Sequence, residues 1–305
     1  MSPWTRPPTS PGTERPDIRF AAGSAVANGT EVVPESAGPP NDGKEFWNET
    51  PTFGTRQMNS SYHRRVVFPT ELGKSTSKQL KGMSPTVVIP VGSTEQHGPH
   101  LPLDTDTRIA TAVADAAVTH LGMTAPACQT VLAPAIAYGA SGEHEGFAGT
   151  VSIGTPALEY LLVEYGRSAA NWARRVVFVN GHGGNTAALT AASCRLRSEG
   201  RDVAWCPCSV PDADAHAGHT ETSVLLHISP ELVCEDERRA GNIAPLAELM
   251  PRMRHGGVAA VSEVGVLGDP TTATATEGAR IFTEMVDNCI GRIGRWAPGT
   301  DGMLT

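Results

Sequence analysis

Histidines, carboxylates and glycines are concentrated in four short motifs of the chain. The first motif spans residues 92–106 and reads GSTEQHGPHLPLDTD. Glu95 and His97 are two residues apart, so an extended segment would point both side chains the same way, and Asp106 follows where a helix is predicted to begin. Carboxylates together with imidazoles are a common ligand set for zinc, iron or manganese, and capping or hydrogen bonding by these groups is the alternative. The motif holds two other candidate ligands that lack the alignment with Glu95, namely His100 and Asp104.

The second motif, NGHGGN, spans residues 180–185 and lies between a predicted strand and a predicted helix. His182 would project from the edge of the sheet, and the glycines permit close approach of the backbone. A phosphate-binding loop is the alternative, because glycine-rich turns before helices bind phosphate. No Lys-Ser/Thr pair follows the glycines, so the central histidine favours a metal.

The third motif reads DADAHAGHTETS and precedes a predicted helix. Glu221 would complete a set of metal ligands, and either His216 or His219 would transfer protons. The alternative needs no metal: Thr220 or Thr222 caps the helix, and the helix dipole stabilises the glutamate. The motif by itself does not decide between the two.

The fourth motif, SGEHEGFAGT at residues 141–150, is a polar loop with glycines at regular points. Loops in this position usually shape pockets, and we expect Glu143, His144 and Phe147 to line the substrate pocket. The alternative is that Glu143, His144 and Glu145 form a solvated run of charges.

Strands and helices alternate along the part of the chain that carries these motifs, which predicts a mostly parallel sheet covered on both faces. Ligands of such folds bind at the carboxyl ends of the strands, where these motifs lie. Thr155 is expected to cap one helix and Pro156 to occupy its first position. Predicted strands cover 86–91, 130–136, 175–180 and 203–208, and predicted helices cover 105–121, 155–172, 185–199, 221–227 and 272–296.

Composition divides the chain near residue 58. Residues 1–57 are rich in Pro, Gly, Thr, Asn and Glu, and we expect a disordered extension. A sharper hypothesis is that Met58 is the true start, with one domain over residues 58–305. The net charge of -8 argues against nucleic acid and anionic membranes as partners. No apolar run resembles a membrane span or a signal peptide, and the six cysteines are expected to be buried thiols, so we predict a cytoplasmic protein.

Taken together, the motifs resemble the creatininase family over nearly all of residues 58–305. The resemblance rests on the first three motifs in this order and on GVLGDP at residues 265–270. It implies a three-layer α/β/α sandwich, a homo-oligomer that is typically a hexamer, and a dinuclear hydrolase site. Two divalent ions (Zn²⁺, Fe²⁺ or Mn²⁺) are implied per subunit. The implied metal ligands are Glu95, His97, Asp106 and His182, with Asp106 bridging the ions.

One departure from the family pattern concerns Gly184, because creatinine amidohydrolases carry a glutamate two residues after the matching histidine. We expect Glu221 to supply the missing carboxylate as a fifth ligand. We assign catalysis to Glu221 and to His216, which would protonate the leaving amine.

Within the family, the fourth motif, the third motif and the segment that begins MNSSYHRR at Met58 look like a peptidase subgroup. This likeness implies cleavage near the C-terminus of a modified precursor peptide, which releases a Val-Tyr-derived piece used to build a redox cofactor. A creatinine- or formamide-type amidohydrolase acting on a small cyclic amide is the alternative enzyme. A non-catalytic metal-dependent binding protein is the alternative outside the enzymes.

Overall fold

Four parallel strands form the single sheet of the computed structural model, which describes residues 70–125 and 129–305. The strands β1 (Thr86–Val91), β2 (Thr130–Leu132), β3 (Arg175–Asn180) and β4 (Val203–Pro207) lie in the order β2-β1-β3-β4. Val91 pairs with Asn180, and Asn180 pairs with Pro207, so β1, β3 and β4 end at the same level. The segments that follow these three strands therefore start side by side.

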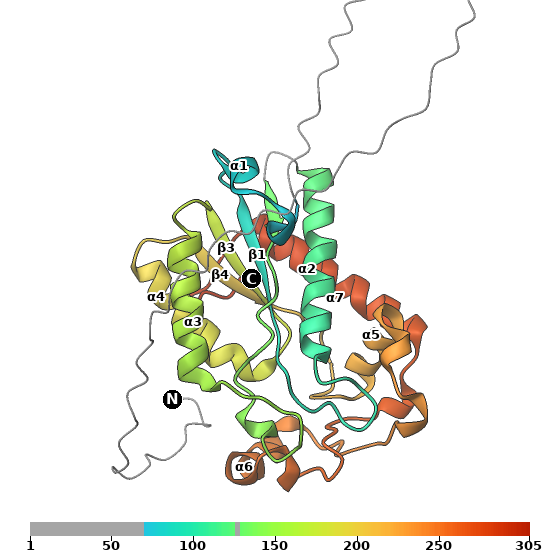
Figure 1. The fold of residues 1–305 in the computed structure, drawn as a ribbon. Helices are drawn as coiled ribbons and strands as arrows, with labels where there is room; N and C mark the ends of the chain where they lie inside the picture. The colour runs from blue at the N-terminus through green and yellow to red at the C-terminus, as the bar shows by residue number, and fades with distance from the viewer. Residues whose placement is uncertain (1–69, 126–128) are drawn as a thin grey trace, which may run out of the picture. The chain divides into compact units, whose positions relative to one another are not determined.

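Helices cover both faces of the sheet (Figure 1). On one face lie α2 (Thr105–Thr124), α5 (His219–Ile228) and α7 (Ala275–Arg295), and on the other lie α3 (Gly154–Ala169) and α4 (Thr186–Ser198). Two further helices, α1 (Ser77–Leu80) and α6 (Leu246–Gly256), lie outside these layers. The predicted three-layer α/β/α sandwich is confirmed.

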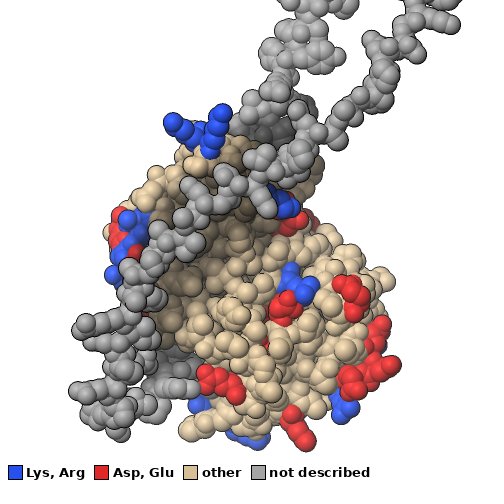
Figure 2. Space-filling view, in the orientation of Figure 1, with Lys and Arg blue, Asp and Glu red and all other residues tan. Residues whose placement is uncertain are grey.

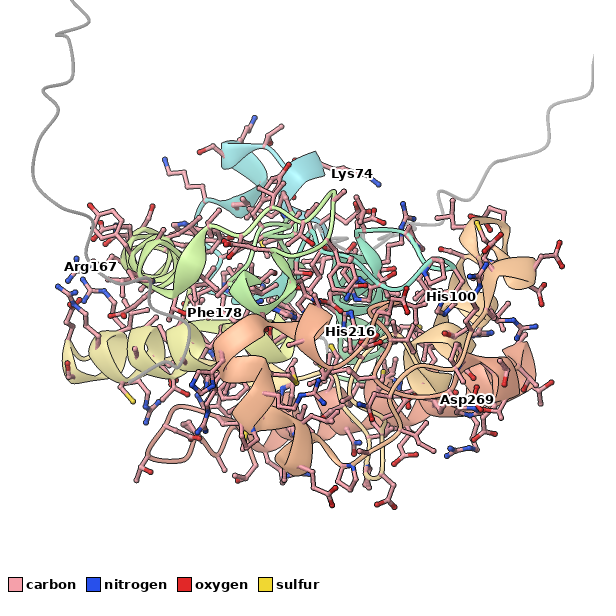
Figure 3. All side chains as sticks on the ribbon, turned by 90° about the horizontal axis from the view of Figure 1, so that it is seen from below. Lys74, His100, Arg167, Phe178, His216 and Asp269 are labelled. Atoms are coloured by element: carbon pink, nitrogen blue, oxygen red, sulfur yellow. The ribbon has the colours of Figure 1, made fainter. Side chains whose placement is uncertain are left out.

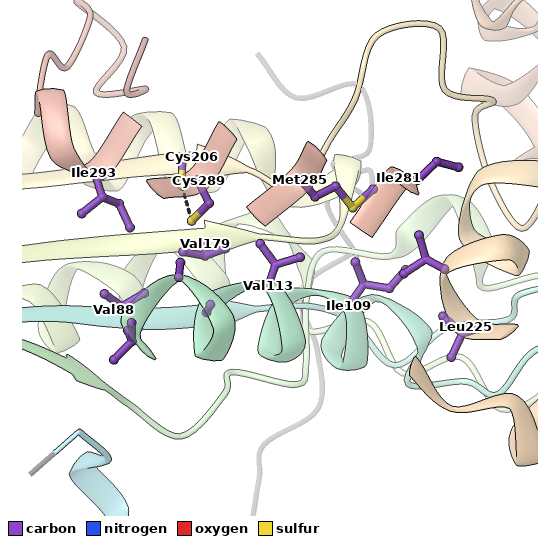
Figure 4. Packing of buried hydrophobic residues seen from close by; sticks show 14 of the residues in the cluster. Val88, Ile109, Val113, Val179, Cys206, Leu225, Ile281, Met285, Cys289 and Ile293 are labelled. Atoms are coloured by element: carbon purple, nitrogen blue, oxygen red, sulfur yellow. Dashed lines mark hydrogen bonds between the residues drawn. The ribbon is translucent and has the colours of Figure 1, made fainter. Parts of the chain in front are cut away.

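Each strand sends alternate side chains into two separate cores. Val88 and Val179 belong to the core between the sheet and α2 and α7, which also contains Ile109 and Met285 (Figure 4). Phe178, by contrast, faces α3 and α4 and is fully buried. Burial on both faces explains why these strands read as uninterrupted apolar runs.

Several predicted boundaries are wrong by a few residues. The strand predicted over 130–136 ends at Leu132, because the chain reaches Pro134, which has no N–H for the ladder. The cap expected at Thr155 and the first position expected at Pro156 are wrong, since α3 begins at Gly154 with Ile153 as its N-cap. The final helix begins at Ala275, where the side chain of Thr274 accepts a hydrogen bond from the first turn.

The described cysteines are all free thiols, but the expectation of burial holds for only two of the five, because Cys194 and Cys208 are partly buried and one is exposed. Cys206 and Cys289 are buried with their sulfurs 4.0 Å apart, whereas Cys234 is exposed. No helix within 70–125 or 129–305 is both long and apolar enough to cross a bilayer. The predicted extension over 1–57, the alternative start at Met58 and Cys128 lie outside the described residues.

Candidate metal centre

Three of the four motifs leave the sheet at the carboxyl ends of adjacent strands. Residues 92–106 follow β1, residues 181–185 follow β3, and residues 208–223 follow β4. The backbone N–H of Gly181 donates to the oxygen of Val91 at 2.8 Å, which ties the first two motifs together. Figure 3 looks onto this end of the molecule, with His216 near the centre of the view and Lys74, Arg167 and Asp269 toward its margin.

Asp106 connects two histidines at the start of α2. Its Oδ1 lies 3.1 Å from His97 Nε2, and its Oδ2 lies 3.2 Å from His182 Nδ1 and accepts a 2.8 Å hydrogen bond from Ser93. Burial opposes ionisation of this carboxyl, but the charge of His97 and the hydrogen bonds from both histidines hold its pKa well below the usual range. Asp106 is therefore an ionised group between the two imidazoles.

Glu95 is fully buried on the His182 side of this pair. Its Oε2 lies 3.2 Å from His182 Nε2, and its Oε1 lies 3.3 Å from His144 Nε2. Neither oxygen has a hydrogen-bond partner of good geometry among the described residues. Burial raises the pKa of Glu95 to about 7, because the charged form loses its water.

Glu221 lies on the other side, near His97. Its Oε2 is 3.9 Å from His97 Nε2 and accepts a 2.6 Å hydrogen bond from the backbone of Ala217. Burial raises the pKa of Glu221, although about a fifth of its side chain (20%) is exposed. The alternative for this motif was a helix cap made by Thr220 or Thr222. In the structure the Asp214 carboxylate caps α5 instead, because it accepts hydrogen bonds from the first amides of the helix.

Gln96 fixes the orientation of two more histidines in the centre. Its side-chain amide donates to His144 Nδ1 at 2.8 Å and to the oxygen of Gly265 at 3.0 Å. His216 Nε2 lies 2.8 Å from the backbone oxygen of Gln96, which can only accept, so this nitrogen carries the proton. The other nitrogen of His216 faces Glu95 Oε1 at 3.7 Å. Burial holds the pKa of both imidazoles well below the usual range, so both are neutral.

The five predicted ligands thus converge, and the two alternatives do not join them. His100 donates or accepts at Thr222 Oγ1, 2.8 Å away, and Asp104 forms an ion pair with Arg108 at the surface. His219, the alternative proton carrier, is half-buried and contacts Thr272 instead. The role of the five side chains as metal ligands stays a prediction.

A cavity of about 260 Å³ opens beside these groups. Asp106, Glu143, His182 and His216 line its polar side, and α6 together with the segment that follows it supplies an apolar wall. Phe147, predicted to line the pocket, instead packs against the apolar cluster beneath α6 and is not among the lining residues. The wall consists of Leu246, Met250, Met253, Val258 and Leu267.

Sequence reasoning missed Gln96, Ser93 and the α6 wall. Gln96 lies between two predicted ligands, and strict strand alternation would have turned it away from them. The segment is irregular at this point, so alternation does not apply. Helix α6 was not predicted because Pro251 interrupts its pattern.

The side chains of the centre fit divalent metal ions. Three overlapping sets have ligand atoms within 4.8 Å of one another: Glu95 with His144 and His216, His97 with His216 and Glu221, and Glu95 with His97 and Asp106. Buried carboxylate oxygens without hydrogen-bond partners are costly unless a cation balances them. The chain is thus an α/β/α sandwich with a buried histidine–carboxylate cluster at its strand ends that could hold metal ions.

The chain belongs to the creatininase family. The family model described as creatinine amidohydrolase matches residues 73–293. A mycofactocin precursor peptide peptidase of Mycolicibacterium smegmatis is 72% identical over 249 residues, which are 81% of this chain and 100% of that protein. The protein of the same name from Mycobacterium tuberculosis H37Rv is 68% identical over 251 residues, again 81% of this chain and all of the relative.

Solved structures of creatininases share the fold. A manganese form of creatininase is 24% identical, with a TM-score of 0.63, and covers 75% of this chain and 100% of its own. A creatinine amidohydrolase is 23% identical, with a TM-score of 0.63, and covers 76% and 99%. At this identity the likeness supports the architecture alone.

Proposed function

We propose that this chain is a metal-dependent peptidase that removes the C-terminal Val-Tyr-derived portion of the modified mycofactocin precursor peptide. The observation that carries the proposal is the 72% identity to a peptidase of that name over the entire length of the relative. Membership of the creatininase family is consistent with hydrolysis of an amide bond. The cavity beside the cluster supports the proposal, because its apolar wall suits a valine or tyrosine side chain.

Glu95, Asp106 and His182 would hold one divalent ion, and His97, Asp106 and Glu221 the other. Divalent ions bound there would activate water as the nucleophile and polarise the scissile carbonyl. Iron, zinc and manganese all suit this donor set. Asp106 holds His97 and His182 in place through its two oxygens, and Ser93 fixes its orientation.

His216 is the proposed proton carrier to the leaving amine. Its Nε2–H is held by the backbone of Gln96, so Nδ1 is the nitrogen directed at the reacting groups. The neutral ring would accept at Nδ1 the proton that the attacking water loses, and would pass it to the departing nitrogen as the C–N bond breaks. Gln96 acts as a positioning residue, because its side-chain amide holds His144 and its backbone oxygen holds His216.

The proposed setting is a cytoplasmic homo-oligomer whose partner is the modified peptide. On the face shown in Figure 2, acidic and basic side chains are interspersed and form no extended basic patch. Together with the net charge of -8, this disfavours nucleic acid as a partner.

The test is incubation of the metal-reconstituted chain with the modified precursor peptide, read by mass spectrometry. We expect release of the C-terminal portion by the native chain and none by Asp106→Ala. Creatinine and formamide analogues are assayed beside the peptide. Turnover of one of these small amides without cleavage of the peptide would reject the proposal in favour of the alternative amidohydrolase, and metal binding without any hydrolysis would favour a binding protein.

A further inference from the structure

The carboxylate of Glu143 fills the space beside Gly184. A Cβ atom at position 184 would lie 2.6 Å from Glu143 Oε1 and 2.4 Å from His182 Nε2. Glu221, which the sequence suggested as the source of the missing carboxylate, lies instead on the His97 side of Asp106. The group that occupies the place next to His182 therefore comes from the loop after β2.

Glu143 faces the same histidine nitrogen as Glu95. Its Oε1 lies 3.7 Å from His182 Nε2, and Glu95 Oε2 lies 3.2 Å from that atom. The 3₁₀ turn Gly142–His144 presents the side chain, and a 3.0 Å hydrogen bond from the His144 N–H to the Ser141 oxygen closes the turn. The cluster is thus divided at Asp106: Glu95, His182 and Glu143 lie on one side, and His97 and Glu221 on the other.

The surroundings of Glu143 leave one of its oxygens without a protein partner. The residue is 8% exposed, and Oε2 has no hydrogen-bond partner within the described parts of the chain. No lysine or arginine forms an ion pair with it in those parts, and its one ion-pair contact is His182. An uncompensated buried carboxylate is unfavourable, and a cation placed beside Oε2 would stabilise its charged form.

The geometry points to Glu143 as a ligand of the metal ion on the His182 side, with Glu95, Asp106 and His182. Glu143, which the sequence placed in the substrate pocket, thereby becomes a metal ligand. The absence of a side chain at Gly184 leaves space for its carboxylate. The inference depends on the dinuclear site of the proposed function, but not on the identity of the substrate. With Glu143 in this place, three carboxylates surround His182 although position 184 holds a glycine.

The experiment compares Glu143→Gln with the native full-length chain and with Glu145→Gln, a matched change at an exposed position two residues away. Each protein is stripped with a chelator, reloaded with Mn²⁺, Zn²⁺ or Co²⁺, and analysed by inductively coupled plasma mass spectrometry. Cobalt absorption spectra report the coordination of each ion. A thermal melt of each metal-free protein verifies folding.

We expect the native chain and Glu145→Gln to bind two ions, and Glu143→Gln to lose one ion or to bind it at least about 100-fold more weakly. Glu143→Asp, which keeps the charge on a shorter stem, should give an intermediate affinity if Glu143→Gln does not fold. Full metal content and an unchanged cobalt spectrum in Glu143→Gln, with a raised KM for the peptide, would overturn the inference. A native chain that binds a single ion would also overturn it, whereas two bound ions without peptide cleavage would count against the proposed function alone.

Discussion

Two adjacent glycines in the turn after β3 differ completely in their surroundings. A Cβ at Gly184 would lie 2.4 Å from the backbone oxygen of Ala140 and 2.4 Å from His182 Nε2. A Cβ at Gly183 would meet nothing within 4 Å. Gly184→Ala and Gly183→Ala therefore add the same methyl group to neighbouring positions, one packed and one open.

The expected magnitude follows from these distances. Ordinary contacts of a Cβ begin near 3.4 Å, so His182 and the Ala140 backbone must retreat by about 1 Å in Gly184→Ala. Overpacking of this kind costs about 1–3 kcal/mol of stability. A displacement of about 1 Å in a catalytic group lowers turnover by roughly 100-fold. We expect both effects in Gly184→Ala, and in Gly183→Ala a change of stability within about 0.5 kcal/mol with full activity.

The assay pairs urea unfolding with kcat/KM for cleavage of the modified peptide at saturating metal. Metal content measured on the same samples shows whether lost activity follows lost ions. Equal stability and equal turnover of the two alanine variants would refute the packing argument, because it would mean that the space at position 184 is not filled as described.

Three other predictions concern parts of the fold outside the centre. Phe178→Ala should cost about 3–5 kcal/mol and lower Tm in calorimetry, because the ring is fully buried, whereas Tyr160→Ala at a 69% exposed position should change little; equal losses would contradict this. Asp214→Ala removes the acceptor of the first amides of α5 and should cost about 0.5–2 kcal/mol in urea unfolding, and an unchanged midpoint would argue against this cap. Burial and nearby positive charge lower the pKa of His100 to about 4, so the unfolded chain binds more protons below about pH 6.5 and stability falls from there toward pH 4. His100→Gln should remove part of that acid loss in unfolding curves recorded across this range, and identical pH profiles would contradict the assignment.

The strands and the convergence of the motifs could be predicted because both follow from local pattern. β1 and β3 are buried on both faces, so they appear as short apolar runs rich in β-branched residues such as Val176 and Val177. Parallel strands end at one edge of their sheet, and polar residues directly after them must therefore meet there. This local pattern was sufficient to predict that four side chains lie close together, namely Glu95, His97, Asp106 and His182.

Boundaries and caps were less predictable, because local signals compete. β2 ends before Pro134 although the apolar run continues beyond it. Pro251 made a helix over α6 hard to predict, although the helix continues through this proline. At the start of α5, the free amides donate to Asp214, although two threonines of the same motif are equally suitable capping residues by type.

Residue types and their order along the chain determined the fold class, the strand ends and the imidazole–carboxylate chemistry of the centre. Tertiary structure alone decided which carboxylate stands on which side of Asp106, with Glu221 next to His97 and Glu143 next to His182. The reason is physical: Glu143 and His182 are 39 positions apart in the sequence, and their contact comes from the packing of a loop against the turn after β3, so no spacing within either segment encodes it.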